Sequence, residues 1–192
     1  MPDNVAKRIV LGSGKFYLAE MPKAVPADAD AIISTFVKPE NEFAGVKNGA
    51  TLTYTPSTYT AEDDLGRFKK TIYTQEVAAL ALGLMTINSG VISKLVSTGR
   101  VSSTASGRQV IKIGGMNNDN GKSYIAIFEH IDKKDGNIYV ILCGKNTAEL
   151  SFAFGKESET VLNPTFTAEP GLDDDGTLIY IVMEEPKADG GE

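Results

Sequence analysis

The chain has no tryptophan, one cysteine and one histidine among its 192 residues. A lone Cys143 excludes an internal disulfide framework, and no cluster of cysteine and histidine offers a structural zinc site. The single histidine, His130, lies in an apolar run next to Glu129, and its spacing indicates no Ser-His-Asp or Cys-His catalytic pairing. We therefore expect His130 to be a core or edge residue and Cys143 to be a small buried apolar residue.

Long apolar runs and clustered positive charge are also scarce. No stretch approaches the roughly 20 apolar residues that span a bilayer, and the polar start Met1-Pro2-Asp3-Asn4 does not resemble a signal peptide. We expect a soluble protein made in a reducing cytoplasm, without a membrane partner. The net charge is -6 and the pI is about 4.9. Such a chain is not expected to bind nucleic acid through its phosphates, which requires clustered Lys and Arg.

Three polar stretches resemble functional motifs but lack essential parts. GSGK at residues 12–15 lacks the preceding glycine and the following Ser or Thr of a phosphate loop, so we interpret it as the turn before a strand. DDDG at residues 173–176 lacks carboxylates at the first and last positions of an EF-hand loop. Residues 62–64 are three adjacent carboxylates. Acid–base catalysis by paired carboxylates requires environments that give them different pKa values, and the sequence indicates no such difference here. We predict no enzyme, no cofactor and no metal site.

Alternating apolar and polar residues predict many short strands. In chain order they lie at Phe16–Glu20, Gly49–Tyr59, Phe68–Leu84, Val110–Ile113, Tyr124–Ile131, Ile138–Cys143, Leu150–Phe154, Thr160–Ala168 and Leu178–Met183. Pro56 indicates an edge strand or a bulge. Many evenly spaced strands with one helix predict a mainly β fold, a β-sandwich or barrel with one flanking α-helix and long loops or arms.

One run is ambiguous between helix and strand. Residues 75–84 include good helix formers. However, the apolar side chains there share one parity, which suits a long strand: Phe68, Ile72, Ala78, Leu80, Leu82 and Leu84. A helix is clearer at Ser89–Thr98, where Asn88 or Ser89 can cap the start and Gly99 can close the end.

The remaining long segments, about Met21–Val46 and Thr60–Gly66, are polar and read as loops. Long ordered loops in a small β domain generally have a function. In a chain without a catalytic cluster, we expect that function to be contact with other subunits.

Four stretches of the sequence resemble those of a known protein family, and together they span most of residues 7–183. They are LGSGKFYLAEMP, KNGATLTYTPSTYTAEDDLGRFKKTI, VIKIGG and SFAFGKESETVLNPTFTAEPGLDDDGTLIYIV. Their order along the chain and their general residue pattern resemble those of the major tail tube protein of long-tailed, siphovirus-type bacteriophages and prophages of Gram-positive bacteria. None of the four is a chemical motif, so the resemblance rests on their order.

The resemblance implies a single tail-tube-like β domain over residues 1–183 and a flexible acidic C-terminal tail over residues 184–192. Six copies would form a ring, and stacked rings would form the tube through which the genome is delivered. The implied partners are the chain itself, the tape-measure, tail terminator and distal tail proteins, and double-stranded DNA in transit without specific binding. The implied location is the tail of the virion, after assembly in the cytoplasm of the host bacterium.

The resemblance also implies roles for three groups of residues. Joined strands would line the lumen, with Leu52, Tyr54, Phe68 and Ile72 as candidates. Glu62, Asp63 and Asp64 in the connection between these strands would make the lumen acidic, so that it repels phosphates and lets DNA slide. The long loops and both termini are candidates for contacts between rings, and the loop candidates are Pro39, Glu40, Asn41 and Glu42.

A second hypothesis is an acidic β-sandwich module that binds carbohydrate or a cell-surface partner. It requires an exposed aromatic platform, for which the candidate rings are Tyr17, Tyr54, Tyr59 and Tyr73. Without tryptophan this platform is weak. A tube subunit should associate with itself, whereas such a module should remain a monomer.

Overall fold

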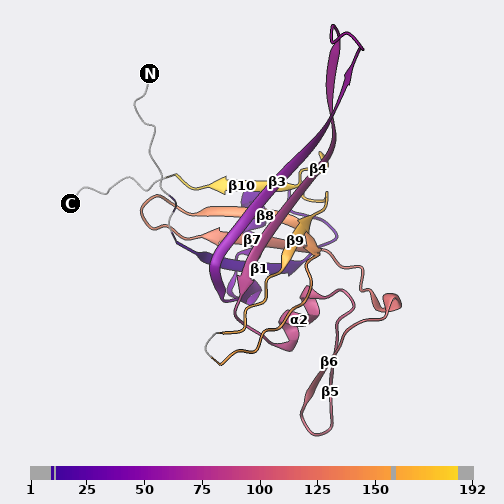
Figure 1. The fold of residues 1–192 in the computed structure, drawn as a ribbon. Coiled ribbons are helices and arrows are strands. Elements are labelled where there is room, and N and C mark those ends of the chain that lie inside the picture. The colour runs from indigo at the N-terminus through magenta and orange to yellow at the C-terminus, as the bar shows by residue number, and fades with distance from the viewer. Residues whose placement is uncertain (1–9, 11, 157–158, 186–192) are drawn as a thin grey trace, which may run out of the picture.

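The computed structural model describes residue 10, residues 12–156 and residues 159–185. The chain is mainly β, as predicted, and Figure 1 shows a central body from which two hairpins project. The strands are β1 (Gly14–Glu20), β2 (Glu42–Ala44), β3 (Val46–Glu62), β4 (Lys69–Leu84), β5 (Arg100–Ser103), β6 (Gln109–Lys112), β7 (Tyr124–His130), β8 (Ile138–Asn146), β9 (Thr165–Ala168) and β10 (Ile179–Met183). The helices are α1 (Ala29–Phe36) and α2 (Ser89–Leu95), with short 3-10 turns η1 (Pro39–Asn41) and η2 (Met116–Asn118).

The body is one branched antiparallel sheet that folds into two layers. β2, β1, β7 and β8 are hydrogen-bonded in that order. Beyond β8 the sheet divides, because β10 pairs with Ile138–Leu142 of β8 while β9 pairs with Gly144–Asn146. β9 continues to β4 and β3, so β8 is shared by both layers. This arrangement agrees with the predicted β-sandwich or barrel.

Buried apolar side chains fill the space between the two layers. Phe16 of β1 and Phe166 of β9 are fully buried, and their ring centroids lie 5.4 Å apart. Burying each such side chain stabilises the fold by roughly 1.5–3 kcal/mol. The other buried members are Leu18, Ala44, Leu80, Leu82, Leu84, Val91, Leu95, Tyr124, Ala126, Phe128, Leu142 and Leu162.

The opposite face of β1, β7 and β8 is covered as well. Ile32 of α1 lies in a second buried cluster with Tyr17, Ile125, Ile127, Tyr139, Ile141, Cys143 and Leu172. All seven residues of β7 are consequently buried. A strand that is covered on both faces reads as a continuous apolar run rather than an alternating one.

The prediction that Met21–Val46 is a long loop was wrong, because α1, η1 and β2 form there. Within the described residues the chain has two α-helices, whereas one flanking helix was predicted. The Asp28 side chain caps α1 by accepting a hydrogen bond of 2.7 Å from the Ala31 N–H. Ile32, Ile33 and Phe36 recur at helical spacing and pack against the sheet. An eight-residue helix has little stability of its own, so this packing rather than propensity explains it.

The other helix and the ambiguous run agree with their predictions. Asn88 caps α2 with a bond of 2.9 Å from the Val91 N–H, and α2 ends at Leu95, before the predicted end at Thr98. Residues 75–84 lie in β4, so the choice of strand over helix is confirmed. β5 was not predicted, although its partner β6 was.

Two other predicted strands differ from the structure. No strand forms at Leu150–Phe154, where the rings of Phe152 and Phe154 stack with centroids 6.1 Å apart. The strand predicted at Thr160–Ala168 is limited to Thr165–Ala168. Pro164 precedes it, and proline has no N–H to donate to a ladder.

GSGK leads into β1, which begins at Gly14. A side chain at Gly14 would overlap the carbonyl oxygen of Glu129 on β7. This glycine is therefore required for the close pairing of β1 with β7, which explains the stretch without a phosphate ligand.

Candidate functional site: a projecting hairpin and an uncovered sheet face

The β3–β4 hairpin is the most prominent feature outside the core. Its strands of 17 and 16 residues extend well beyond the body (Figure 1). Near the body, Leu52 and Leu80 are opposed and pack toward the core. From residue 53 to residue 77 every side chain is exposed except that of Asp63, which is half-buried. The outer half of the hairpin therefore has solvent on both faces.

The outer edge of β3 is unpaired. Within the described part of the chain, β3 is hydrogen-bonded to β4 alone, and it is the last strand of the sheet. Pro56 lies in this edge strand, as predicted, and a register shift follows at Ser57 and Thr58. A two-stranded ribbon is at best marginally stable in water, and a long free edge is a template for another strand. The free edge of β3 therefore leaves backbone groups to which a further strand could bond.

A bulge in β4 separates the predicted lumen residues onto different faces. Ser57 pairs with Gln75 and Thr58 with Tyr73, so Thr74 is an extra residue in β4. Ile72 lies opposite Tyr59, on the face away from Leu52 and Tyr54. Phe68 lies in the turn just before β4 begins. The four candidates are all in or beside the hairpin, but they do not share one face.

Asp63 organises the tip of the hairpin. One oxygen of its carboxylate accepts a bond of 2.8 Å from the Phe68 N–H, and the other accepts 3.1 Å from the Arg67 Nε. The backbone bond from Phe68, followed by the Arg67 side chain, holds the pKa of Asp63 below its ordinary value. The carboxylate of Asp63 therefore stabilises the turn through these two hydrogen bonds.

The other charges at the tip are balanced. Glu62 lies 3.7 Å from Lys69, and residues 62–70 hold three acidic and three basic side chains. Glu62, Asp63 and Asp64 are adjacent in space, as their sequence requires. Their net contribution to an acidic lumen is reduced by Arg67, Lys69 and Lys70 next to them.

One face of the sheet carries small uncharged side chains. The register places Thr51, Ala81 and Thr165 in one row and Thr53, Ala79 and Thr167 in the next. Each of these side chains is exposed or half-buried. Their hydroxyl groups bond locally, as in the 2.6 Å contact between the oxygens of Thr147 and Thr167. The second row continues to Lys145 on β8, which forms an ion pair of 3.0 Å with Glu169, so the one cation next to Thr167 in that row already has an acidic partner. The sequence analysis did not identify this threonine face.

The predicted ring-contact loop is partly engaged within the chain. Asn41 donates a bond of 3.0 Å to the Phe36 carbonyl at the end of α1, and Glu42 forms an ion pair of 2.8 Å with Lys15. Pro39 and Glu40 remain exposed in η1. Asn41 and Glu42 are thus committed to contacts within the chain, whereas Pro39 and Glu40 fit the predicted contact between rings better.

The aromatic platform of the second hypothesis does not form. Tyr17 is buried, whereas Tyr54, Tyr59 and Tyr73 are 51%, 60% and 72% exposed. Tyr59 and Tyr73 project from opposite faces of the hairpin, because Tyr73 lies opposite Thr58. The rings therefore do not combine into one stacking surface.

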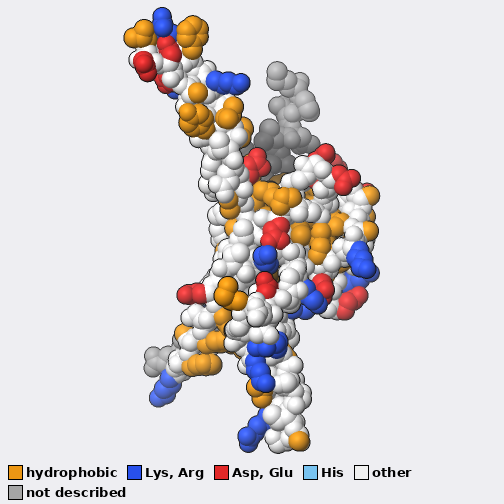
Figure 2. Space-filling view, turned by 90° about the vertical axis from the view of Figure 1, so that its right-hand side faces the viewer, with side chains coloured by type: hydrophobic (Ala, Val, Ile, Leu, Met, Phe, Trp, Pro, Cys, Tyr) orange, Lys and Arg blue, Asp and Glu red, His pale blue; other side chains and the backbone are white. Residues whose placement is uncertain are grey.

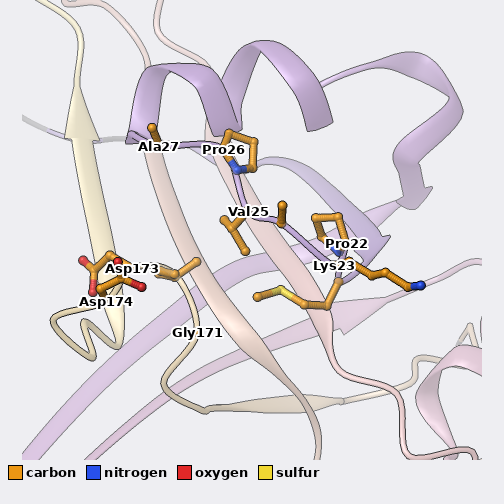
Figure 3. Close-up of a pocket in the computed structure, with 11 residues that line it drawn as sticks. Pro22, Lys23, Val25, Pro26, Ala27, Gly171, Asp173 and Asp174 are labelled. Carbon is orange, nitrogen blue, oxygen red and sulfur yellow. The ribbon is translucent and has the colours of Figure 1, made fainter.

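A separate pocket of about 590 Å³ lies between residues 21–27 and residues 171–174. Figure 3 shows Asp173 and Asp174 on one side, while the Lys23 side chain points away from them. Asp173 accepts bonds of 2.9 Å from the Thr177 N–H and 2.6 Å from the Tyr180 hydroxyl. The pocket therefore lies between the proline-rich loop and the loop that precedes β10.

A partly buried polar cluster joins the end of β10 to the body. Glu129 accepts bonds from the Tyr17 hydroxyl at 2.8 Å and from Asn137 Nδ2 at 3.1 Å. Glu184 accepts bonds from the Asn137 N–H at 2.9 Å and from the Tyr139 hydroxyl at 3.2 Å. Burial is the main cause that raises the pKa of Tyr139 to about 12. Glu184, assigned by sequence to the tail, is thus held by the domain, and residues 186–192 lie outside the described part.

His130 and Cys143 are both buried. His130 is 4% exposed, and its Nδ1 lies 3.1 Å from the Ser13 carbonyl oxygen. Burial raises the pKa of the Cys143 thiol to about 11, which disfavours the reactive thiolate. Both observations agree with the core assignments from sequence.

No protein-family model matches the chain, and no curated protein matches it significantly. Among the described residues, no three His, Cys, Asp or Glu side chains gather where they could hold a metal ion. The helices of that same part are too short or too polar to cross a membrane.

Proposed function

We propose that this chain is the structural subunit of a bacteriophage tail tube, which assembles into six-membered rings that stack into a conduit for the genome. The observation that carries the proposal is the β3–β4 hairpin, exposed on both faces and unpaired along the edge of β3. Joining such edges around a closed ring satisfies their backbone groups and removes the aggregation hazard. The order of the sequence segments, which resembles that of tail tube proteins, supports the same function.

The proposed conduit is electronegative overall and presents little to which DNA could bind. The chain carries a net charge of -6, to which Glu62, Asp63 and Asp64 contribute. The threonine face itself carries no charged side chain, and Lys145 at its border is paired with Glu169. DNA would pass without specific binding, because counterion release requires cations that contact its phosphates. In this proposal the tube belongs to the virion tail and meets the tape-measure, terminator and distal tail proteins.

Sedimentation velocity from micromolar to millimolar concentration tests self-association. A tube subunit grows into large species as the concentration rises, because a head-to-tail interface does not close at a dimer. A single slow boundary at every concentration would contradict the proposal and favour a monomeric binding module.

A further inference from the structure

The middle of the chain contains an unusually long segment without acidic residues. From Val77 to Asn118 there is no Asp or Glu, while Lys94, Arg100, Arg108 and Lys112 are present. Because the whole chain has a net charge of -6 and this segment contributes +4, the remaining residues carry -10. The segment is therefore net positive because it lacks acidic residues, whereas the rest of the molecule is net negative.

The β5–β6 hairpin gathers most of this charge on one face. Arg100 lies opposite Lys112, and Ser102 lies opposite Val110. Bonds between Thr104 and Arg108 continue the ladder, so Arg108, Val110 and Lys112 follow each other on the same face. In Figure 2 the lowest projection of the molecule carries Lys and Arg side chains without acidic ones. This basic face, defined by Arg100, Arg108, Val110 and Lys112, is exposed.

The basic face contains an unfavourable arrangement in the isolated chain. Like charges directly opposite in an antiparallel pair are destabilising, and Arg100 and Lys112 are such a pair. Arg100 is held by Asn118 Oδ1 at 2.7 Å and by the Gly114 carbonyl. Across the described ranges, neither Arg108 nor Lys112 has a carboxylate partner. An anionic partner would remove this repulsion.

A groove at the base of the β3–β4 hairpin has the complementary chemistry. It has a volume of about 520 Å³, and Leu52, Tyr54, Ile179 and Ile181 give it an apolar surface. Glu76 and Asp175 are the acidic residues at its rim. Ile181 of β10 is 53% exposed in this groove. The groove therefore offers apolar contact bordered by negative charge.

We propose that the β5–β6 hairpin of one copy docks in this groove of a second copy, with Val110 on the apolar surface and Arg108 and Lys112 beside Glu76 and Asp175. The β5–β6 hairpin projects from the body on the side away from β10 and the projecting β3–β4 hairpin (Figure 1), so the contact joins two different surfaces and can repeat from copy to copy. The inference rests on the proposed self-assembly and identifies one contact that drives it.

A second copy fits the basic face better than nucleic acid does. Affinity for nucleic acid comes largely from the number of phosphates that Lys and Arg neutralise, and this face offers only Arg100, Arg108 and Lys112. The remaining -10 of charge on the chain would repel DNA, but it supplies the acidic partner that a neighbouring copy needs.

Reciprocal charge reversal tests the contact. The hairpin variant is Arg108→Glu with Lys112→Glu, and the groove variant is Glu76→Lys with Asp175→Lys. All four side chains are exposed, so both variants should keep the far-UV circular dichroism of the native chain. The matched control for the hairpin variant, Lys133→Glu with Lys134→Glu, makes the same charge change as that variant in the exposed turn between β7 and β8.

Each variant alone should require at least about a tenfold higher concentration to assemble than the native chain or the control. An equimolar mixture should restore assembly, because each reversed surface then meets its opposite. Raising the ionic strength from about 0.1 M to about 1 M, which shortens the Debye length from about 10 to about 3 Å, should weaken assembly of the native chain.

The outcomes separate this inference from the proposed function. The proposed contact is wrong if the native chain and the hairpin variant assemble equally well, or if the mixture fails to restore assembly. Neither result contradicts the proposal that the chain forms a tail tube. If the native chain does not assemble at all, both are wrong. Duplex DNA binding that the hairpin variant loses, with self-assembly unchanged, would reassign the basic face to nucleic acid.

Discussion

Asp173 shows how a carboxylate in an exposed loop can be committed to the fold. It accepts bonds from the Thr177 N–H, the Tyr180 hydroxyl and the Asp175 N–H. The hydrogen bonds from Thr177 and then Tyr180 lower the pKa of Asp173 to about 2. The sequence reading of residues 173–176 as a turn before a strand is confirmed, but only the structure shows that one of the three aspartates fastens that turn to β10.

Replacing Asp173 with Asn should make the protein less dependent on pH in acid. Because the folded chain holds the pKa of Asp173 below its ordinary 3.8, the ionised carboxylate stabilises the fold above about pH 4. This contribution is lost as the pH falls toward 2. The difference in Tm between the native chain and Asp173→Asn should therefore shrink between pH 4 and pH 2. Asp174→Asn, at the exposed neighbour, is the control, and a difference that stays constant across this window would contradict the account.

At the scale of elements, the sequence predicted the parts that depend on local pattern. The β7–β8 hairpin and the cap of α2 by Asn88 lie where turn and capping residues indicate them. α1 was missed because it is short and its apolar residues matter only against the sheet. The bulge at Thr74 has no turn residue to mark it, yet it moves Ile72 to the other face of β4. Period-two reasoning fails wherever a strand contains such an extra residue.

The candidate site was predictable in part for the same reason. The strands of the projecting hairpin and the acidic residues of its tip follow from alternation and composition. Their pairing with Arg67 and Lys69 requires the turn geometry. The threonine face and the groove near β10 bring together strands far apart in sequence, and no local pattern predicts which strands become neighbours.

Shortening the β3–β4 hairpin should separate folding from assembly. Replacing residues 57–75 by Asn-Gly joins Pro56 to Glu76, which are opposed, through a two-residue hairpin turn. The removed side chains are exposed apart from Asp63, so Tm should change by only a few degrees. Self-association should be lost.

Scanning calorimetry and sedimentation velocity would measure the two effects on the same samples. Lys156→Gln, an exposed change outside the hairpin, is the control and should associate like the native chain. A shortened chain that still assembles would show that the hairpin is not an assembly element.

At the scale of the whole molecule, the arrangement is polar. The long β3–β4 hairpin projects from one end of the body and the basic β5–β6 hairpin from the other (Figure 1). A subunit with different surfaces at its two ends stacks in one direction, and such stacking continues until another protein stops it. The same layout supports the proposed attraction between copies of an acidic chain, because the segment that holds the β5–β6 hairpin carries +4 while the remaining residues together carry -10.

Negative-stain electron microscopy of the concentrated native protein tests the central claim most directly. The account predicts rings with six-fold symmetry, or hollow tubes built from them, in which the body of each subunit surrounds an open channel. Uniform single particles at every concentration, or closed dimers without a channel, would contradict the claim that this chain is a tail tube subunit.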